Sequence, residues 1–177
     1  MSDNKQAPTP EYSGKFALLM VLGLWIIVMV FGTLWAQRWF EARNAPSDPE
    51  LAVGPDGRPE VILESDGRGH FLVNGSVNGE TVGFLVDTGA SSIAIPEPLA
   101  MRLGLESGYP VTTQTANGVS TAYTTIIDSV EIGGLELTNV RALIAPGLDG
   151  QVALLGMSFL RHFELVQKEG LLTIRMP

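Results

Sequence analysis

The sequence contains no cysteine and two histidines, and these shortages exclude several kinds of active site. Without cysteine there are no disulfides, no thiolate zinc ligands and no cysteine nucleophile. His162 is followed by Phe163 and Glu164, so the H-E-x-x-H pattern of zinc peptidases is missing, and no G-x-S-x-G elbow is present for a serine nucleophile. We therefore expect neither a metal nor another cofactor, and we expect His70 and His162 to be structural or exposed.

Basic residues are also scarce. The chain has 11 Lys and Arg against 19 Asp and Glu, a formal net charge of −8. A surface of this sign repels phosphate backbones, so nucleic acid is not expected as a partner. The acidic residues are spread along the chain, which is typical of a solvated protein surface.

One long apolar run stands near the N-terminus. Residues 16–36 (FALLMVLGLWIIVMVFGTLWA) are 21 residues without a charge. As a helix they would span about 31 Å, which matches the hydrocarbon core of a bilayer. A soluble helix of this length would normally have a polar face, and this run has none. Trp35, Trp39 and Phe40 follow at its C-terminal end, where an interfacial aromatic belt is expected.

This run is either a retained signal anchor or a cleaved signal peptide. It is longer than a usual signal-peptide core and no A-x-A-like site follows it, which favours the anchor. Two lysines precede the run and two arginines follow it, so the positive-inside rule leaves the orientation nearly tied. The simpler topology has a short disordered tail, residues 1–15, and an exported C-terminal domain.

The rest of the chain divides into a linker and one domain. Residues 41–60 carry four prolines and no apolar periodicity, which predicts a linker. The folded domain is expected over residues 61–177, a normal size for one domain.

Within this domain the patterns predict a mainly β fold with two short helices. Asn78-Gly79, Asn117-Gly118, Gly133-Gly134 and Glu169-Gly170 are the expected hairpin turns. The expected strands are residues 70–77, 80–87, 111–116, 119–125, 126–132, 135–144, 152–155, 163–167 and 171–175. The expected helices are residues 96–103, with a proline at the start, and 158–162.

The sequence Asp87-Thr88-Gly89 directly follows the apolar residues of an expected strand. An ionised carboxylate at the end of a buried strand is costly unless something compensates it, and a catalytic role would be one reason to keep it there. The tripeptide alone is a weak signal and is more typical of a turn.

The surrounding sequence resembles the retropepsin-like (clan AA) aspartic proteases. FLVDTGASS, residues 84–92, is similar to their active-site motif, and the hairpin of residues 114–123 follows where that family has its flap. ALLGMSFL, residues 153–160, resembles a second signature, in which two apolar residues and a glycine pass behind the catalytic loop into a short helix. The resemblance covers residues 61–175. The N-terminal run resembles the anchor of bacterial members whose protease domains face the periplasm, which implies a single-pass protein of the inner membrane.

The resemblance implies a retropepsin-like acid protease β-barrel and assigns roles to individual residues. Asp87 would be the catalytic carboxylate, Thr88 would brace the two catalytic loops across a dimer axis, and Gly89 would permit a tight turn. Ser91 stands where several viral members have an acidic residue, so contacts to the substrate backbone would differ there. The residues expected to contact substrate are Ala90, Ser91, Ala116, Asn117, Gly118 and Val119.

Only one such motif is present. Asp56-Gly57, Asp66-Gly67 and Asp149-Gly150 lack the intervening threonine or serine and read as turns. The second carboxylate of an aspartic protease would therefore come from Asp87 of a second copy, in a homodimer. An anchor would favour this dimer by confining the copies to the membrane.

The sequence thus predicts an aspartic endopeptidase that cleaves protein or peptide substrates near the membrane. Two alternatives stay open: a non-catalytic retropepsin-like module for dimerisation or peptide binding, and a purely structural anchored β domain. The hairpin of residues 114–123 is either a flap or an ordinary surface hairpin. The strand at residues 171–175 either joins a sheet between subunits or closes the sheet of its own monomer.

Overall fold

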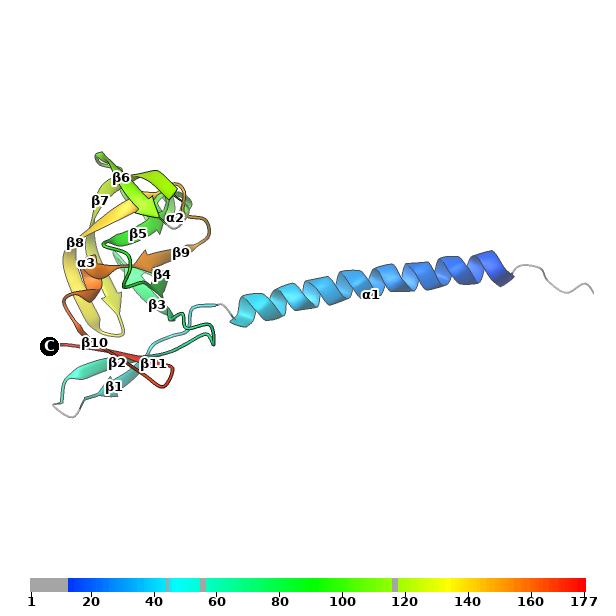
Figure 1. Ribbon diagram of the computed structural model, residues 1–177, viewed down its shortest axis with the longest axis horizontal. Coiled ribbons are helices and arrows are strands. Elements are labelled where there is room, and N and C mark those ends of the chain that lie inside the picture. Colours follow the sequence, from blue (N-terminus) through cyan, green and yellow to red (C-terminus); the bar gives the residue numbers. More distant parts are fainter. Residues whose placement is uncertain (1–12, 44, 55–56, 116–117) are drawn as a thin grey trace, which may run out of the picture. The chain divides into compact units, whose positions relative to one another are not determined.

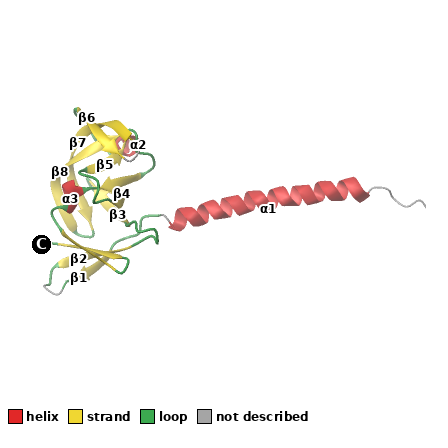
Figure 2. Ribbon diagram, in the orientation of Figure 1, coloured by secondary structure: helices red, strands yellow, loops and turns green. Residues whose placement is uncertain are grey.

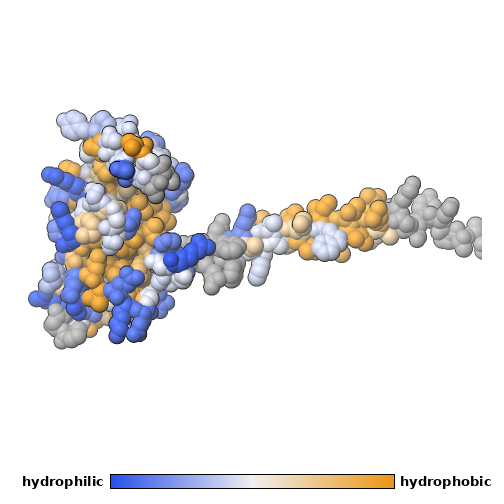
Figure 3. Space-filling model, viewed as in Figure 1, coloured by the Kyte–Doolittle hydropathy of each residue, from blue (hydrophilic) through white to orange (hydrophobic). Residues whose placement is uncertain are grey.

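The computed structural model describes residues 13–43, 45–54, 57–115 and 118–177, which form two compact units, Met1–Arg43 and Asn44–Pro177 (Figure 1). The first unit contains helix α1 (Ser13–Arg43). Its segment Ala17–Arg38 has a mean hydropathy of 2.6 and is long and apolar enough to cross a membrane. The apolar side chains of this segment are exposed, as Figure 3 shows in orange.

Helix α1 extends beyond the predicted residues 16–36 at both ends. No glycine or proline occurs between Thr33 and Ala45, so nothing in the sequence stops the helix soon after the apolar run. Pro46 then disfavours further helix in the residue before it. The tail predicted to be disordered is corrected at its end, since the helix begins at Ser13; residues 1–12 lie outside the described residues.

The second unit is mainly β, as predicted, and is built on two sheets (Figure 2). The larger sheet has the strand order β3-β4-β9-β5-β8-β7-β6. Strand β3 also pairs with β7, at Ser76↔Glu131 and Val77↔Val130, so six of these strands close into a barrel and β6 extends it. The strands are β3 (Leu72–Val77), β4 (Glu80–Val86), β5 (Ile93–Pro96), β6 (Pro110–Thr115), β7 (Gly118–Ile132), β8 (Leu135–Ala145) and β9 (Val152–Leu155).

Two features of this sheet differ from the prediction. Residues 119–125 and 126–132 form one strand, β7, because the alternation of buried and exposed side chains continues through Thr125, Ile126 and Ile127 without a turn residue. Strand β5 was not predicted, since it has only four residues, three of them buried, and is too short to show an alternating pattern.

The smaller sheet has the order β1-β2-β11-β10 and corrects the predicted linker of residues 41–60. Strand β1 (Glu50–Val53) pairs with β2 (Pro59–Glu64), so only the beginning of that segment connects the two units. The prolines wrongly indicated a linker because they flank the strands. Pro59 is the first residue of β2, a position at which a strand tolerates proline. The other strands are β10 (Glu164–Lys168) and β11 (Leu171–Arg175).

The C-terminal strand β11 lies between β2 and β10 of its own chain. Arg175 fixes it there: its Nε lies 2.8 Å from Glu164 Oε2 and its Nη1 lies 3.2 Å from Glu60 Oε1. The hydrogen bond that Arg175 donates to Glu164 is the main reason that the pKa of Arg175 is raised. Of the two arrangements left open by the sequence, the strand therefore closes the sheet of its own monomer.

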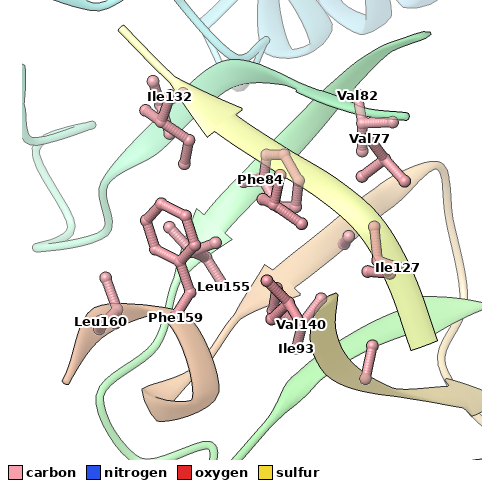
Figure 4. Packing of buried hydrophobic residues seen from close by; sticks show 14 of the residues in the cluster. Val77, Val82, Phe84, Ile93, Ile127, Ile132, Val140, Leu155, Phe159 and Leu160 are labelled. Atoms are coloured by element: carbon pink, nitrogen blue, oxygen red, sulfur yellow. The ribbon is translucent and has the colours of Figure 1, made fainter. Parts of the chain in front are cut away.

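The core lies inside the barrel and beneath the short helix α3 (Met157–Leu160). Figure 4 shows Phe84 of β4 near the middle of this cluster, with Leu155 of β9 and Phe159 of α3 on one side of it and Ile127 of β7 on the other, all fully buried. Each such side chain contributes roughly 1.5–3 kcal/mol by leaving water. The remaining helix, α2 (Glu97–Arg102), is one residue shorter at each end than the predicted residues 96–103, because Pro96 is the last residue of β5, and it buries Leu99 and Ala100. In Figure 1 the small sheet lies at one end of this unit and the β6–β7 hairpin at the other.

Candidate active site

Asp87 is the first residue after β4, at the carboxyl end of a parallel pair of strands. Strand β4 pairs with β9 in parallel, with Val86 opposite Leu155. The backbone N–H of Asp87 continues this pairing by donating to the Leu155 carbonyl oxygen, 3.1 Å away. The position of the carboxylate is therefore set by the sheet, even though the residue begins a loop.

The loop of residues 87–92 turns back on the Asp87 side chain. The N–H of Gly89 donates to Asp87 Oδ1 at 2.8 Å, and the N–H of Ala90 donates to the Asp87 carbonyl oxygen at 3.2 Å. Asp87 is half-buried, while Thr88 and Gly89 are exposed. The backbone thus holds one carboxylate oxygen and leaves the side chain at the surface of the unit.

Helix α3 supports this loop from behind. The N–H of Met157 donates to the Ala90 carbonyl oxygen at 2.8 Å, and the N–H of Ile93 donates to Ser158 Oγ at 2.9 Å. A Cβ atom on Gly156 would lie 2.2 Å from the Ser92 carbonyl oxygen and 2.8 Å from that of Ala90. A glycine is required here because two backbones touch, although its own φ of −93° suits any residue.

A cleft of about 740 Å³ opens above the loop and beneath the β6–β7 hairpin. It has the size and the mostly small and apolar lining of a ligand site. Among the described residues that line it, Asp87 is the one carboxylate. The lining residues are Asp87, Gly89, Ala90, Ser91, Ser92, Ala94, Thr113, Gln114, Thr115, Gly118, Val119, Ser120, Ala122, Leu143, Ala145, Gly147, Leu148 and Leu154.

The structure brings most of the predicted site residues to this one cleft. Asp87, Gly89, Ala90 and Ser91 line it from the loop, and Gly118 and Val119 line it from the hairpin. Thr88 is exposed on the same loop and does not line the cleft. Two predicted residues, Ala116 and Asn117, lie outside the described residues.

Several lining residues were missed by the sequence reasoning. Leu143 and Ala145 come from the end of β8, and Gly147 and Leu148 from the turn after it. The one available signal was the turn sequence Ala145-Pro146-Gly147 after a strand, and it does not indicate that the turn faces the hairpin.

The β6–β7 hairpin covers the cleft, as the flap interpretation requires. Its strands pair from Pro110↔Tyr123 to Thr115↔Gly118, and Val119 has 76% of its surface exposed. Thr113 and Thr115 each donate a hydroxyl hydrogen bond across the hairpin, to the Ser120 and Gly118 carbonyl oxygens. The hairpin is thus tied internally and offers small and apolar side chains to the cleft.

Neither histidine lines this cleft. His70 Nδ1 lies 3.2 Å from Asp66 Oδ2 in the loop between β2 and β3, and His162 is exposed after α3. The backbone N–H of Arg68, and then that of His70, lower the pKa of Asp66. Within the described part of the chain, no three His, Asp or Glu side chains come close enough together to hold a metal ion.

The arrangement matches a known family of proteins. A family model described as "gag-polyprotein putative aspartyl protease" matches residues 73–162, which contain the loop, the hairpin and α3. A solved structure of a retropepsin-like aspartic protease from Rickettsia conorii is 36% identical and superposes with a TM-score of 0.57. That match covers 64% of this chain and 97% of the other.

Two curated relatives are uncharacterized proteins. One, from the cobV 5′ region of a Sinorhizobium species, is 34% identical over 125 residues, which cover 69% of this chain and 54% of the relative. The other, from Rickettsia prowazekii (strain Madrid E), is 41% identical over 109 residues, which cover 59% of this chain and 46% of the relative. The chain spans about half the length of the curated relatives it matches.

The contact behind the loop predicts the effect of Gly156→Ala. The added methyl group would collide with the Ser92 and Ala90 carbonyl oxygens and push the loop of residues 87–92 forward. We expect a loss of about 1–3 kcal/mol in the free energy of unfolding. Urea denaturation of the full chain in a non-ionic detergent measures this loss.

Gly147→Ala is the matched control, because the nearest atom to its added methyl group is the movable Ser120 Oγ, at 3.2 Å. Its stability should stay within about 0.5 kcal/mol of the wild type. Equal stabilities for the two variants would show that the backbone contact at Gly156 is not tight.

Proposed function

Because the chain belongs to the gag-polyprotein aspartyl protease family and has a retropepsin-like fold, we propose that it is an aspartic endopeptidase that acts as a homodimer. The observation that carries the proposal is the cleft with a single carboxylate, Asp87, held at the end of a strand beneath a hairpin. A retropepsin-type site needs two carboxylates, and the described lining of the cleft supplies one per chain.

The chemistry follows from placing two Asp87 side chains face to face. Two carboxylates in such proximity cannot both be ionised, so the pair shares one proton. The ionised member takes a proton from a water molecule while the water oxygen attacks the scissile carbonyl carbon. The protonated member donates to the carbonyl oxygen, and collapse of the tetrahedral intermediate transfers a proton to the leaving amine. Atoms and charge balance with water as the only co-reactant.

The other site residues would position this reaction. Gly89 N–H holds Asp87 Oδ1, which fixes the plane of the carboxylate. Thr88 is exposed on the same loop, where it would brace the matching loop of the second copy. The hairpin residues Gly118 and Val119 would cover the peptide and exclude water; Ala116 and Asn117 would complete that cover. Ala90 and Ser91 would contact the peptide from below.

The homodimer must form without strand β11 as an added edge. That strand already has neighbours on both sides within its own chain. The loops that carry Asp87 and Thr88 are exposed, and they are the part of the surface that the mechanism requires the copies to share. The helix α1 would raise the local concentration of copies by confining them to a membrane.

We expect Asp87→Asn to abolish cleavage, because the amide can neither take a proton from water nor share one. The loss should be at least about a thousandfold. The assay uses the full chain in non-ionic detergent, with denatured casein and a mixed peptide library as substrates. Asp128→Asn, an exposed change that removes the same charge from β7, is the control and should cleave like the wild type.

Residual cleavage by Asp87→Asn at the wild-type rate would remove Asp87 from the mechanism. Peptide binding by both proteins without cleavage by either would favour the non-catalytic peptide-binding module instead.

Mixing subunits tests the shared site. If each site needs two Asp87 side chains, adding Asp87→Asn protein to wild type at constant total concentration should reduce activity as the square of the wild-type fraction. Half wild type would then retain about a quarter of the activity after the subunits exchange. A linear decline, to one half, would mean that a single chain is sufficient.

We further propose that α1 anchors the protein in the inner membrane as a single-pass helix, with the second unit in the periplasm, where its substrates would be proteins near the membrane. Protease added to spheroplasts should then degrade the second unit, while protease added to intact cells should not. Degradation only after lysis of the spheroplasts would place the domain in the cytoplasm.

A further inference from the structure

A second groove adjoins the cleft on the other side of the catalytic loop. It has a volume of about 650 Å³ and lies between that loop, the middle of β8 and the end of α3. Ser91 and Ser92 line both the groove and the cleft, so the two cavities meet at these residues. The lining residues are Ser91, Ser92, Leu137, Thr138, Asn139, Val140, Arg141, Ser158, Arg161 and His162.

The charge of this groove is opposite to that of the domain around it. Residues 44–177 contain 16 acidic and 7 basic side chains, a balance of 7 − 16 = −9. Two of those seven, Arg141 and Arg161, line the groove together with His162, and none of its lining residues is acidic. A positive groove beside the cleft is therefore not a consequence of the overall composition.

The two arginines also differ from Arg175 and Arg102 in the partners of their side chains. Arg175 is held between two glutamates, and Arg102 donates to Gln151. Arg141 and Arg161 are both exposed, and their side chains make no hydrogen bond or ion pair with any residue that the structure describes. Their guanidinium groups thus keep their donors available, and the planar fork of these donors fits a carboxylate.

We propose that this basic groove binds an aspartate or glutamate side chain of the substrate, and so selects polypeptides with an acidic residue near the scissile bond. The inference rests on the proposed function, since the peptide reaches the groove from the Asp87 cleft by way of Ser91 and Ser92. Ser91 is four residues from Asp87. An extended peptide spans the same distance in about four residues or fewer, at roughly 3.3 Å each.

That residue 91 is a serine and not an acidic residue is part of this selection. An acidic side chain at this point of the loop would repel an acidic substrate residue and pair with the arginines. The two serines offer hydroxyl donors and no charge, which leaves Arg141 and Arg161 to determine the preference.

The experiment compares cleavage of a neutral parent peptide with versions that carry one glutamate at each position up to four residues from the scissile bond. The enzyme is the full chain in non-ionic detergent. Wild type should cleave at least one glutamate version with kcat/KM about fivefold higher than the parent at low salt, and high salt should reduce the gain. The double variant Arg141→Gln/Arg161→Gln should lose this gain, and Arg161→Glu should reduce the rate on glutamate versions relative to lysine versions.

Arg68→Gln is the matched control, because it removes one positive charge from an exposed loop outside both cavities. It should keep the preference for glutamate. If this variant also lost the preference, the net charge of the protein and not the basic groove would be its cause, and the proposed site would be overturned.

The two proposals fail in distinguishable ways. If wild type cleaves the parent and the glutamate versions equally well, the basic groove has no role in selection and the proposed function stands. If wild type cleaves no peptide faster than Asp87→Asn does, the proposed function fails. Fluorescence anisotropy of Asp87→Asn with labelled neutral and glutamate-containing peptides then decides on the groove, and equal affinities would overturn it.

Discussion

The close contact between Gly156 and the carbonyl oxygens of Ala90 and Ser92 is the constraint on which the site depends. It allows helix α3 to lie against the loop of residues 87–92, so that Met157 bonds to the loop backbone and Ser158 to Ile93 directly after it. The same helix carries Phe159 and Leu160 into the core. The loop that presents Asp87 is therefore attached to the buried core of the domain, which fixes the position of the carboxylate.

Closure of the large sheet places the Asp87 loop on one side of the cleft and the β6–β7 hairpin on the other. Strands β4 and β9 run in parallel and end together, which places Asp87 and Gly156 at one edge of the barrel. The long strand β7 pairs with β6 through its first residues, Gly118 to Tyr123, and with β8 from Tyr123 to Ile132. Because one strand is shared between the barrel and the hairpin, the hairpin lies over the Asp87 loop and the cleft between them has a fixed floor and a cover that is tied by its own hydrogen bonds.

The number of carboxylates in the cleft bears on whether the chain must form a dimer. The described lining of the cleft holds one aspartate, which is half of an acid–base pair, so the proposed mechanism requires a second copy. The small sheet does not offer its C-terminal strand for that purpose, because Arg175 and its two glutamates hold β11 between β2 and β10. The exposed loop and the apolar helix α1 are then the features most suited to bring two copies together.

The sequence by itself determined the local features: the apolar helix, most hairpins through their Asn-Gly and Gly-Gly turns, and the order of the three motifs around Asp87. These follow from short-range rules, because turn residues and hydrophobic periodicity act within a few positions. Strands β1, β2 and β5 were not predicted, since prolines flank the first two and β5 has only four, mostly buried, residues. Only the tertiary structure decided that the turn after β8 faces the hairpin, that β11 stays within its own sheet, and that Arg141 and Arg161 share a groove with Ser91. Each of these joins residues far apart in the chain, and their proximity depends on how the strands pair, which no local pattern encodes.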